Sequence, residues 1–238
     1  MEQKKLPGFL NFIDLKTMGI LSLMFIICAI FWNTPLIYPI KLFVVILHEF
    51  SHGLVAVITG GQIDRIEIDY RVGGVCYFRG GNAFLSASAG YLGSIFWGGL
   101  ILILAAKTKY DNIMGMIIGA FLVILSILYV RNMFGFFFTL LFGISLIIIS
   151  YKASNYVLDL VMKFLGMTSC LYAIIDIKED LISRTNIGSD ADYIAQSLGW
   201  QKLSVPIGII WILIALLSFC IFLFIAGKND EKKKSSEK

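Results

Sequence analysis

The chain has 238 residues, of which 58% are hydrophobic and only 15% are charged, and its mean hydropathy is +0.83. These values exclude an ordinary soluble domain and indicate a membrane protein. Much of the formal net charge of +4 comes from the terminal segments, so we expect these basic residues to face the lipid bilayer or water, and no nucleic acid to be a partner.

Seven apolar stretches are candidates to span a bilayer, which takes roughly 20 residues. In chain order they cover residues 18–32, 37–59, 83–106, 113–130, 133–150, 155–177 and 205–226. The first is short, and the fourth and fifth meet at so brief a turn that they could form one bent segment. The sequence therefore predicts an all-α polytopic membrane protein with about six to seven transmembrane helices.

The remaining segments divide the chain around a single membrane-embedded domain over residues 18–226. Residues 1–17 are predicted to be an N-terminal interfacial segment, and residues 227–238 a disordered basic tail. The polar loop over residues 178–202 is expected in water or at the interface. Lys and Arg residues divide almost evenly between the two sides of this arrangement, so the positive-inside rule leaves the orientation open.

A different pattern follows the second stretch, over residues 62–81. Ile63, Ile66 and Ile68 alternate with charged residues, and a second run follows Gly73-Gly74. This alternation predicts a short β-hairpin. Because an open strand edge cannot face hydrocarbon, the hairpin should lie at the interface or inside the bundle. It is either a structural plug or lid, or an edge to which an unwound substrate segment adds as a strand.

Both histidines of the chain lie in the run His48-Glu49-Phe50-Ser51-His52, inside the second apolar stretch. Residues i and i+4 share one face of a helix, so the two imidazoles could hold one zinc ion. An unpartnered Glu49 near the bilayer centre would cost about 2.5–3.5 kcal/mol, and a divalent cation would be its partner. We predict His48 and His52 as metal ligands, Glu49 as the general base and Zn²⁺ as the cofactor of a hydrolase. The alternative is that the histidines only form hydrogen bonds between helices.

A catalytic zinc site normally has three protein ligands, so the motif leaves one ligand to be found. Asp176 is the predicted third ligand, because it follows a long apolar run and has Asp180 one turn later on the same face. Asp180, Asp190 and Asp192 are alternative ligands, or partners that would orient a histidine. A carboxylate at a helix end such as Asp176 could also simply reach water.

Small residues recur at helical spacing in the third long stretch, within Ala89-Gly90-Tyr91-Leu92-Gly93-Ser94 and at Gly98-Gly99. Such residues let helix backbones approach closely, which is mainly a packing feature. The functional interpretation is that this face packs against the histidine-bearing helix with Ser94 close to the metal. Arg131-Asn132 is interpreted as an interfacial turn, with stabilisation of an oxyanion as the alternative.

Taken in order, these segments resemble the site-2 protease class of intramembrane zinc metallopeptidases, and within it the small branch shared by bacteria and plants. The wider class takes its third ligand from an Asn-Pro-x-x-Asp-Gly type of motif, and this chain contains no such run. The matching pieces are Leu47-His48-Glu49-Phe50-Ser51-His52-Gly53, Thr59-Gly60-Gly61, Gly73-Gly74, Ala89-Gly90-Tyr91-Leu92-Gly93-Ser94, Leu171-Tyr172 to Asp176, Asp180 and Ser189-Asp190-Ala191.

The resemblance implies a helical bundle that holds zinc inside the membrane plane and cleaves membrane-spanning substrates. His48 and His52 would be ligands and Glu49 the catalytic base. It also implies a multi-pass protein of the bacterial plasma membrane. Two other functions stay open: a non-proteolytic relative acting as a membrane chaperone or regulatory binding protein, and a small ion or metal transporter. Retention of Glu49 argues against the first, and the lack of a repeat argues against the second.

Overall fold

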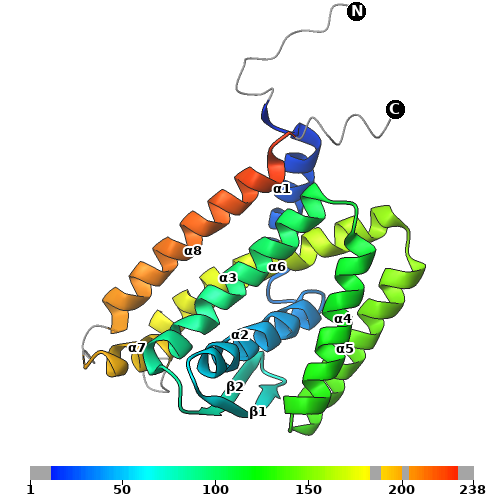
Figure 1. The fold of residues 1–238 in the computed structure, drawn as a ribbon. Coiled ribbons are helices and arrows are strands. Elements are labelled where there is room, and N and C mark those ends of the chain that lie inside the picture. The colour runs from blue at the N-terminus through cyan, green and yellow to red at the C-terminus, as the bar shows by residue number, and fades with distance from the viewer. Residues whose placement is uncertain (1–11, 183–188, 200–203, 230–238) are drawn as a thin grey trace, which may run out of the picture.

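The computed structural model describes residues 12–182, 189–199 and 204–229. Within these ranges the chain forms helices and one two-stranded antiparallel sheet, which confirms the predicted fold class (Figure 1). The elements are α1 (Leu15–Phe31), α2 (Tyr38–Ile58), β1 (Gln62–Asp69), β2 (Gly73–Arg79), α3 (Ala83–Lys107), α4 (Asp111–Tyr129), α5 (Met133–Lys152), α6 (Asn155–Ile182), α7 (Asp190–Ser197) and α8 (Ser204–Gly227).

Six of the described helices are long and apolar enough to cross a membrane, namely α2, α3, α4, α5, α6 and α8. The apolar helix α1 is shorter, with 17 residues. The two ends of the described chain lie side by side, because the backbone N–H of Asp14 donates to the carbonyl of Gly227 at 2.8 Å (Figure 1). The division into an interfacial segment, one domain and a tail stays a prediction, and residues 1–11 and 230–238 lie outside the described residues.

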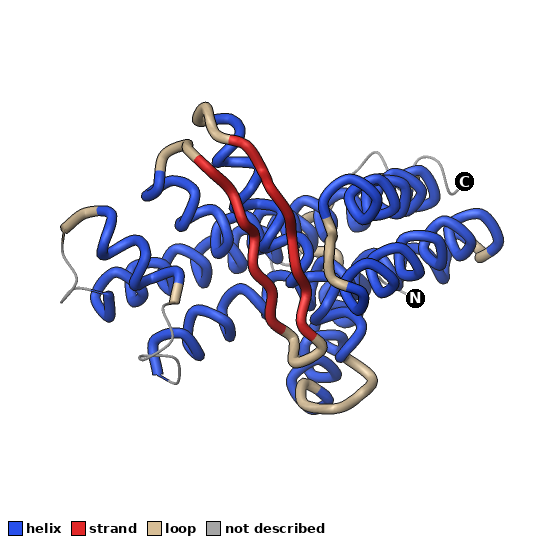
Figure 2. Tube along the Cα trace, turned by 90° about the horizontal axis from the view of Figure 1, so that it is seen from below, coloured by secondary structure: helices blue, strands red, loops and turns tan. Residues whose placement is uncertain are grey.

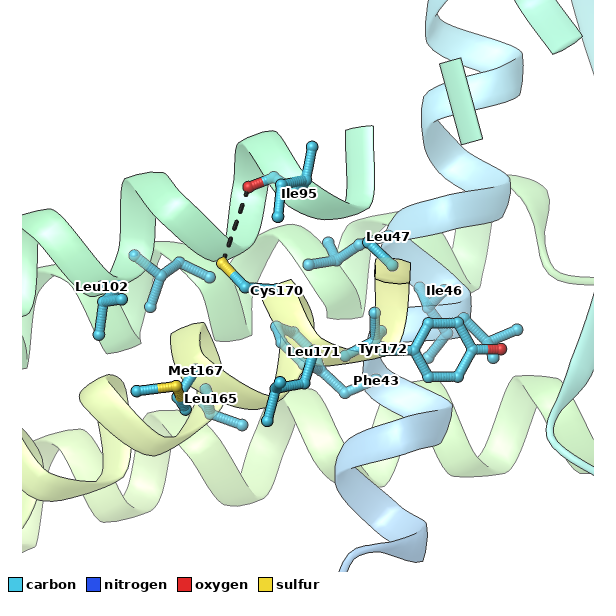
Figure 3. Packing of buried hydrophobic residues seen from close by; sticks show 14 of the residues in the cluster. Phe43, Ile46, Leu47, Ile95, Leu102, Leu165, Met167, Cys170, Leu171 and Tyr172 are labelled. Carbon is cyan, nitrogen blue, oxygen red and sulfur yellow. Dashed lines mark hydrogen bonds between the residues drawn. The ribbon is translucent and has the colours of Figure 1, made fainter. Parts of the chain in front are cut away.

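The centre of the bundle is the contact between α3 and α6. A Cβ atom added at Gly166 would lie 2.7 Å from the backbone nitrogen of Leu102 and 2.8 Å from the carbonyl oxygen of Gly98. Glycine therefore sets how closely the two helices approach, as small residues do between membrane helices. Figure 3 shows the side chains packed around this contact, where the Cys170 thiol donates to the carbonyl of Ile95 at 3.9 Å.

The hairpin has one apolar and one charged face. Ile66 and Ile68 are fully buried, whereas the outward positions carry charged residues such as Arg65, which pairs with Glu67 at 2.7 Å. Because a strand directs alternate side chains to opposite faces, this pattern lets the hairpin cover the helices while its charged face stays outside. Figure 2 shows both strands running across one side of the helical bundle.

The outer edge of β1 is covered by the turn between α4 and α5. The backbone N–H of Arg131 donates to the carbonyl of Ile66 at 3.1 Å. The Asn132 side chain accepts from the N–H of Ile68 at 3.0 Å and donates to its carbonyl at 2.7 Å. Arg131-Asn132 is thus a turn, as interpreted from the sequence, and it anchors the hairpin.

The polar segment after α6 holds a helix that the sequence analysis did not predict. Helix α6 continues to Ile182, and α7 then begins at Asp190. Ser189 is the N-cap of α7 and forms a capping box with Asp192, whose carboxylate accepts from the Ser189 backbone and hydroxyl at 3.1 Å each. A serine followed three residues later by an acidic residue is a sequence signature of a helix start. The start of α7 could therefore have been predicted from the sequence.

Candidate metal centre

The two histidines lie one turn apart on the inner face of α2. Their ring centroids are 4.7 Å apart, and both side chains are buried. Helix α2 begins with a proline in its first turn, and mostly apolar residues with no further proline lead to the histidines. The i, i+4 spacing therefore brings the two imidazoles together as predicted.

A carboxylate from a distant part of the chain completes this group. Oδ2 of Asp190, at the start of α7, lies 3.0 Å from Nε2 of His48 and 3.2 Å from Nε2 of His52. These three residues offer one ligand atom each, all within 4.8 Å of one another. Ligand atoms around a tetrahedral zinc ion lie about 3.4 Å apart, so the donor set fits such an ion.

The opposite ring nitrogens make contacts that orient both imidazoles. Nδ1 of His52 lies 2.7 Å from the carbonyl oxygen of Ser86, which can only accept, so this nitrogen carries the proton. Nδ1 of His48 faces the Ser94 hydroxyl at 3.3 Å and Oδ2 of Asp176 at 3.6 Å. Protonation at Nδ1 leaves the Nε2 lone pairs directed toward Asp190. Histidines that bind a metal through one ring nitrogen typically make such a contact with the other.

Helix α3 leaves space for the two Nε2 atoms at Gly90. A Cβ atom at this position would lie 2.4 Å from Nε2 of His48 and 2.4 Å from Nε2 of His52. Any side chain here would occupy the place where the two lone pairs converge. Gly90 is thus required for a group to be held between the imidazoles.

Glu49 lies beside the two histidines and against β2. A Cβ atom at Gly74 would be 2.7 Å from Cγ of Glu49 and 3.0 Å from its Oε1. The carboxylate also interacts with the backbone amide of Cys76. The same environment raises the pKa of the Cys76 thiol to about 12, first through burial and then through the nearby charge of Glu49. The hairpin therefore packs against the predicted base and limits its position.

These groups open into a cavity of about 800 Å³ between α2, β2, α3, α6 and α7. Its lining includes four carboxyl groups, and among the described residues that line it there is no Lys or Arg. His48, His52 and Asp190 on this wall offer ligand atoms that could hold one cation. The carboxyl groups are those of Glu49, Asp176, Asp180 and Asp190.

The family model described as "Peptidase M50B-like" matches residues 21–225. The chain belongs to this family. The M50B-like match confirms the resemblance to the site-2 protease class, and with the six apolar helices it identifies an integral, multi-pass membrane protein. No curated protein and no solved structure matches the chain.

Asp176, the predicted third ligand, lies in this M50B-like protein on the Nδ1 side of His48 and outside the group of three potential ligand atoms. Asp190, one of the alternatives, lies inside it. Asp180 accepts a hydrogen bond from the hydroxyl of Tyr91 at 2.5 Å, and Asp192 forms the capping box of α7. The assignment of Asp176 stays a prediction, and the distances favour Asp190.

The structure also places the small-residue face of α3 and the Arg131-Asn132 turn. The Ala89–Ser94 face of α3 packs against α2, and Ser94 lies behind the His48 ring, at Nδ1. Neither Arg131 nor Asn132 is among the residues lining the cavity, so the oxyanion alternative has no geometric support. The sequence signal that points to Asp190 is the Ser189-Asp190-Ala191 piece of the resemblance. No periodicity indicated it, because α7 is only eight residues long and lies in the polar segment between α6 and α8.

Proposed function

We propose that this protein is an intramembrane zinc metalloprotease that hydrolyses a peptide bond in or near a transmembrane segment of a membrane-protein substrate. The observation that carries the proposal is the group of His48, His52 and Asp190, with Glu49 beside it in a carboxylate-rich cavity. Two imidazoles, a carboxylate and a neighbouring glutamate match the composition of catalytic zinc sites in hydrolases. The bacterial plasma membrane, implied by the resemblance, is part of the proposal.

In this proposal His48, His52 and Asp190 hold the zinc ion, and Asp176 and Ser94 orient His48. Bound zinc supplies a Lewis acid that polarises the scissile carbonyl and lowers the pKa of water. Glu49 takes a proton from the attacking water while the water oxygen adds to the carbonyl carbon of the scissile bond. When the C–N bond breaks, Glu49 returns the proton to the leaving amine. The reaction consumes one water and leaves one new carboxylate and one new amine.

The substrate segment is proposed to bind as an extended strand along β2. Ile66 and Ile68 direct their backbone groups outward to the α4–α5 turn. In an antiparallel pair their partners across the sheet, Cys76 and Gly74, then direct theirs to the opposite edge. Both partners line the cavity, which supports strand addition next to Glu49. An unwound segment suits the chemistry, because a helical peptide bond has its carbonyl occupied and is sterically covered.

Metal content and proteolysis measured on matched variants test the proposal. Purified wild-type protein should contain about one zinc per chain by elemental mass spectrometry. Glu49→Gln should keep that zinc, and Asp190→Asn should lose most of it. Asp176→Asn should keep more than Asp190→Asn, because the removed charge lies behind the His48 ring. The reverse order of these two variants would make Asp176 the third ligand.

Proteolysis is read from new protein N-termini in isolated membranes that contain either wild-type protein or Glu49→Gln. The proposal expects new termini within transmembrane segments for the wild type, reduced about 10²–10⁴-fold in the variant, because a general base is lost. If the wild-type protein contains zinc but generates no new N-termini, the result would instead favour a membrane chaperone or regulatory binding protein. Metal flux through reconstituted vesicles that is unaffected by Glu49→Gln would favour the transporter.

A further inference from the structure

A buried tyrosine joins three helices immediately behind the candidate metal centre. Tyr91 in α3 is 1% exposed. Its hydroxyl donates to Oδ2 of Asp180 in α6 at 2.5 Å and accepts from the backbone N–H of Ala191 in α7 at 3.3 Å. Because the backbone N–H of Ala191 can only donate, the Tyr91 oxygen accepts in the second bond, and its single proton is left for Asp180.

The second of these bonds acts on the residue next to Asp190. The capping box of Ser189 and Asp192 is internal to α7, so it stabilises the helix start without placing that helix against the bundle. The Ala191–Tyr91 bond, in contrast, connects the first turn of α7 to α3. Among the described residues, it is the hydrogen bond that joins the backbone of α7 to another helix.

The surroundings of Tyr91 make this connection rigid. Its ring lies edge-on to His48, with centroids 6.0 Å apart, and packs with the buried side chains of Ile177 and Ile194. Because Tyr91 is buried, a lost partner would leave its hydroxyl as an unsatisfied buried polar group, which is costly. Asp180 holds the hydroxyl proton and thereby turns an oxygen lone pair toward Ala191.

We propose that Tyr91 is a positioning residue: its hydroxyl, oriented by Asp180, sets the place of the Asp190 carboxylate against the two imidazoles. The inference rests on the proposed function, since it takes Asp190 to be a metal ligand. Tyr91 is not among the residues that line the cavity, so it acts through Asp190 and not on the substrate. Outer contacts of this kind typically change metal affinity 10–100-fold.

The test compares Tyr91→Phe with Tyr38→Phe in the full chain. Both substitutions remove one tyrosine hydroxyl, and Tyr38 donates to the carbonyl of Tyr70 at the hairpin, away from α7. Co²⁺ is the probe, because its visible absorption reports ligand geometry and its affinity is measured by chelator competition. Tyr91→Phe should weaken Co²⁺ binding about 10–100-fold and change the visible spectrum, and Tyr38→Phe should change neither. Wild-type affinity and spectrum in Tyr91→Phe would overturn the inference.

A second variant covers the case in which Tyr91→Phe does not fold. Asp180→Asn keeps an oxygen acceptor for the hydroxyl but weakens it, so it should reduce Co²⁺ affinity by less than Tyr91→Phe, about 3–10-fold on the scale of such contacts. An unchanged affinity in Asp180→Asn would also overturn the inference. If wild-type protein binds Co²⁺ through Asp190 but generates no new N-termini, the protease proposal fails and the positioning role stands. If Asp190→Asn leaves Co²⁺ affinity unchanged, the ligand assignment fails, and the positioning role fails with it.

Discussion

The inner helices and the α4–α5 pair differ in how much of their surface the protein itself covers. Of the apolar windows of α2, α3 and α6, 67%, 61% and 72% are buried, against 28% each for α4 and α5. The imidazoles and carboxylates of the candidate site come from α2, α6 and the short α7, and α3 shields them. Ionisable groups at membrane depth need partners and cover, so the site lies where the bundle is densest. The α4–α5 pair contributes indirectly, by anchoring the hairpin.

The largest effect is expected where α3 meets the two histidines. Gly90→Ala would place a methyl group 2.4 Å from both Nε2 atoms, so zinc content should fall from about one per chain to near zero. Gly19→Ala in α1 is the control, because a Cβ atom there meets nothing within 4 Å. Elemental analysis of both purified variants makes the measurement. Full zinc in Gly90→Ala would mean that the imidazoles do not converge at this point.

The next largest effect is expected on proteolysis, through the position of Glu49, while zinc content stays unchanged. Gly74→Ala forces Glu49 to move, whereas a Cβ atom at the adjacent Gly73 meets nothing within 4 Å. A displacement of about 1 Å at a catalytic group costs up to about 10²-fold in rate. We expect Gly74→Ala to lower the yield of new N-termini about 10–100-fold while zinc is retained, and Gly73→Ala to retain zinc. Equal rates for wild type and Gly74→Ala would contradict the role given to Glu49.

A third prediction compares the two regions directly by stability. Leu102 in α3 is 0% exposed and Ile124 in α4 is 56% exposed. Leu102→Ala should lower the free energy of unfolding by about 2–5 kcal/mol, because it leaves a cavity. Ile124→Ala should change it by less than about 0.5 kcal/mol. Denaturation in mixed micelles measures both, and similar losses for the two variants would remove the distinction between inner and outer helices.

The smallest effect is expected where the outer pair reaches the hairpin. Asn132→Ala removes both side-chain hydrogen bonds to the backbone of Ile68, a loss of about 1–2 kcal/mol. Backbone amides of β1 should then exchange with solvent faster, with zinc content unchanged, as followed by hydrogen exchange mass spectrometry. Asn132→Asp, which keeps the acceptor, should have an intermediate effect. Loss of zinc in Asn132→Ala would show that the hairpin supports the metal centre itself.

The helices and the hairpin were predictable because their signals are local. Apolar runs of the required length predicted the long helices, and alternation predicted the hairpin of β1 and β2. The i, i+4 spacing alone was sufficient to place His48 and His52 on one face. By contrast, the position of Asp176 in a long apolar helix predicts it as the third ligand, and this stays a prediction. Its carboxylate lies 3.6 Å from Nδ1 of His48, on the opposite side of the ring from Asp190.

The sequence by itself determined the membrane class, the position of the hairpin and the pair of imidazoles with a carboxylate between them, since each depends on residues within a few turns or strands of one another. Only the tertiary structure decided that Asp190, 138 positions after His52, joins that pair. Its place depends on how α3, α6 and α7 pack, and on a tyrosine hydroxyl shared among them. Such contacts between distant segments leave no periodic trace in a single chain.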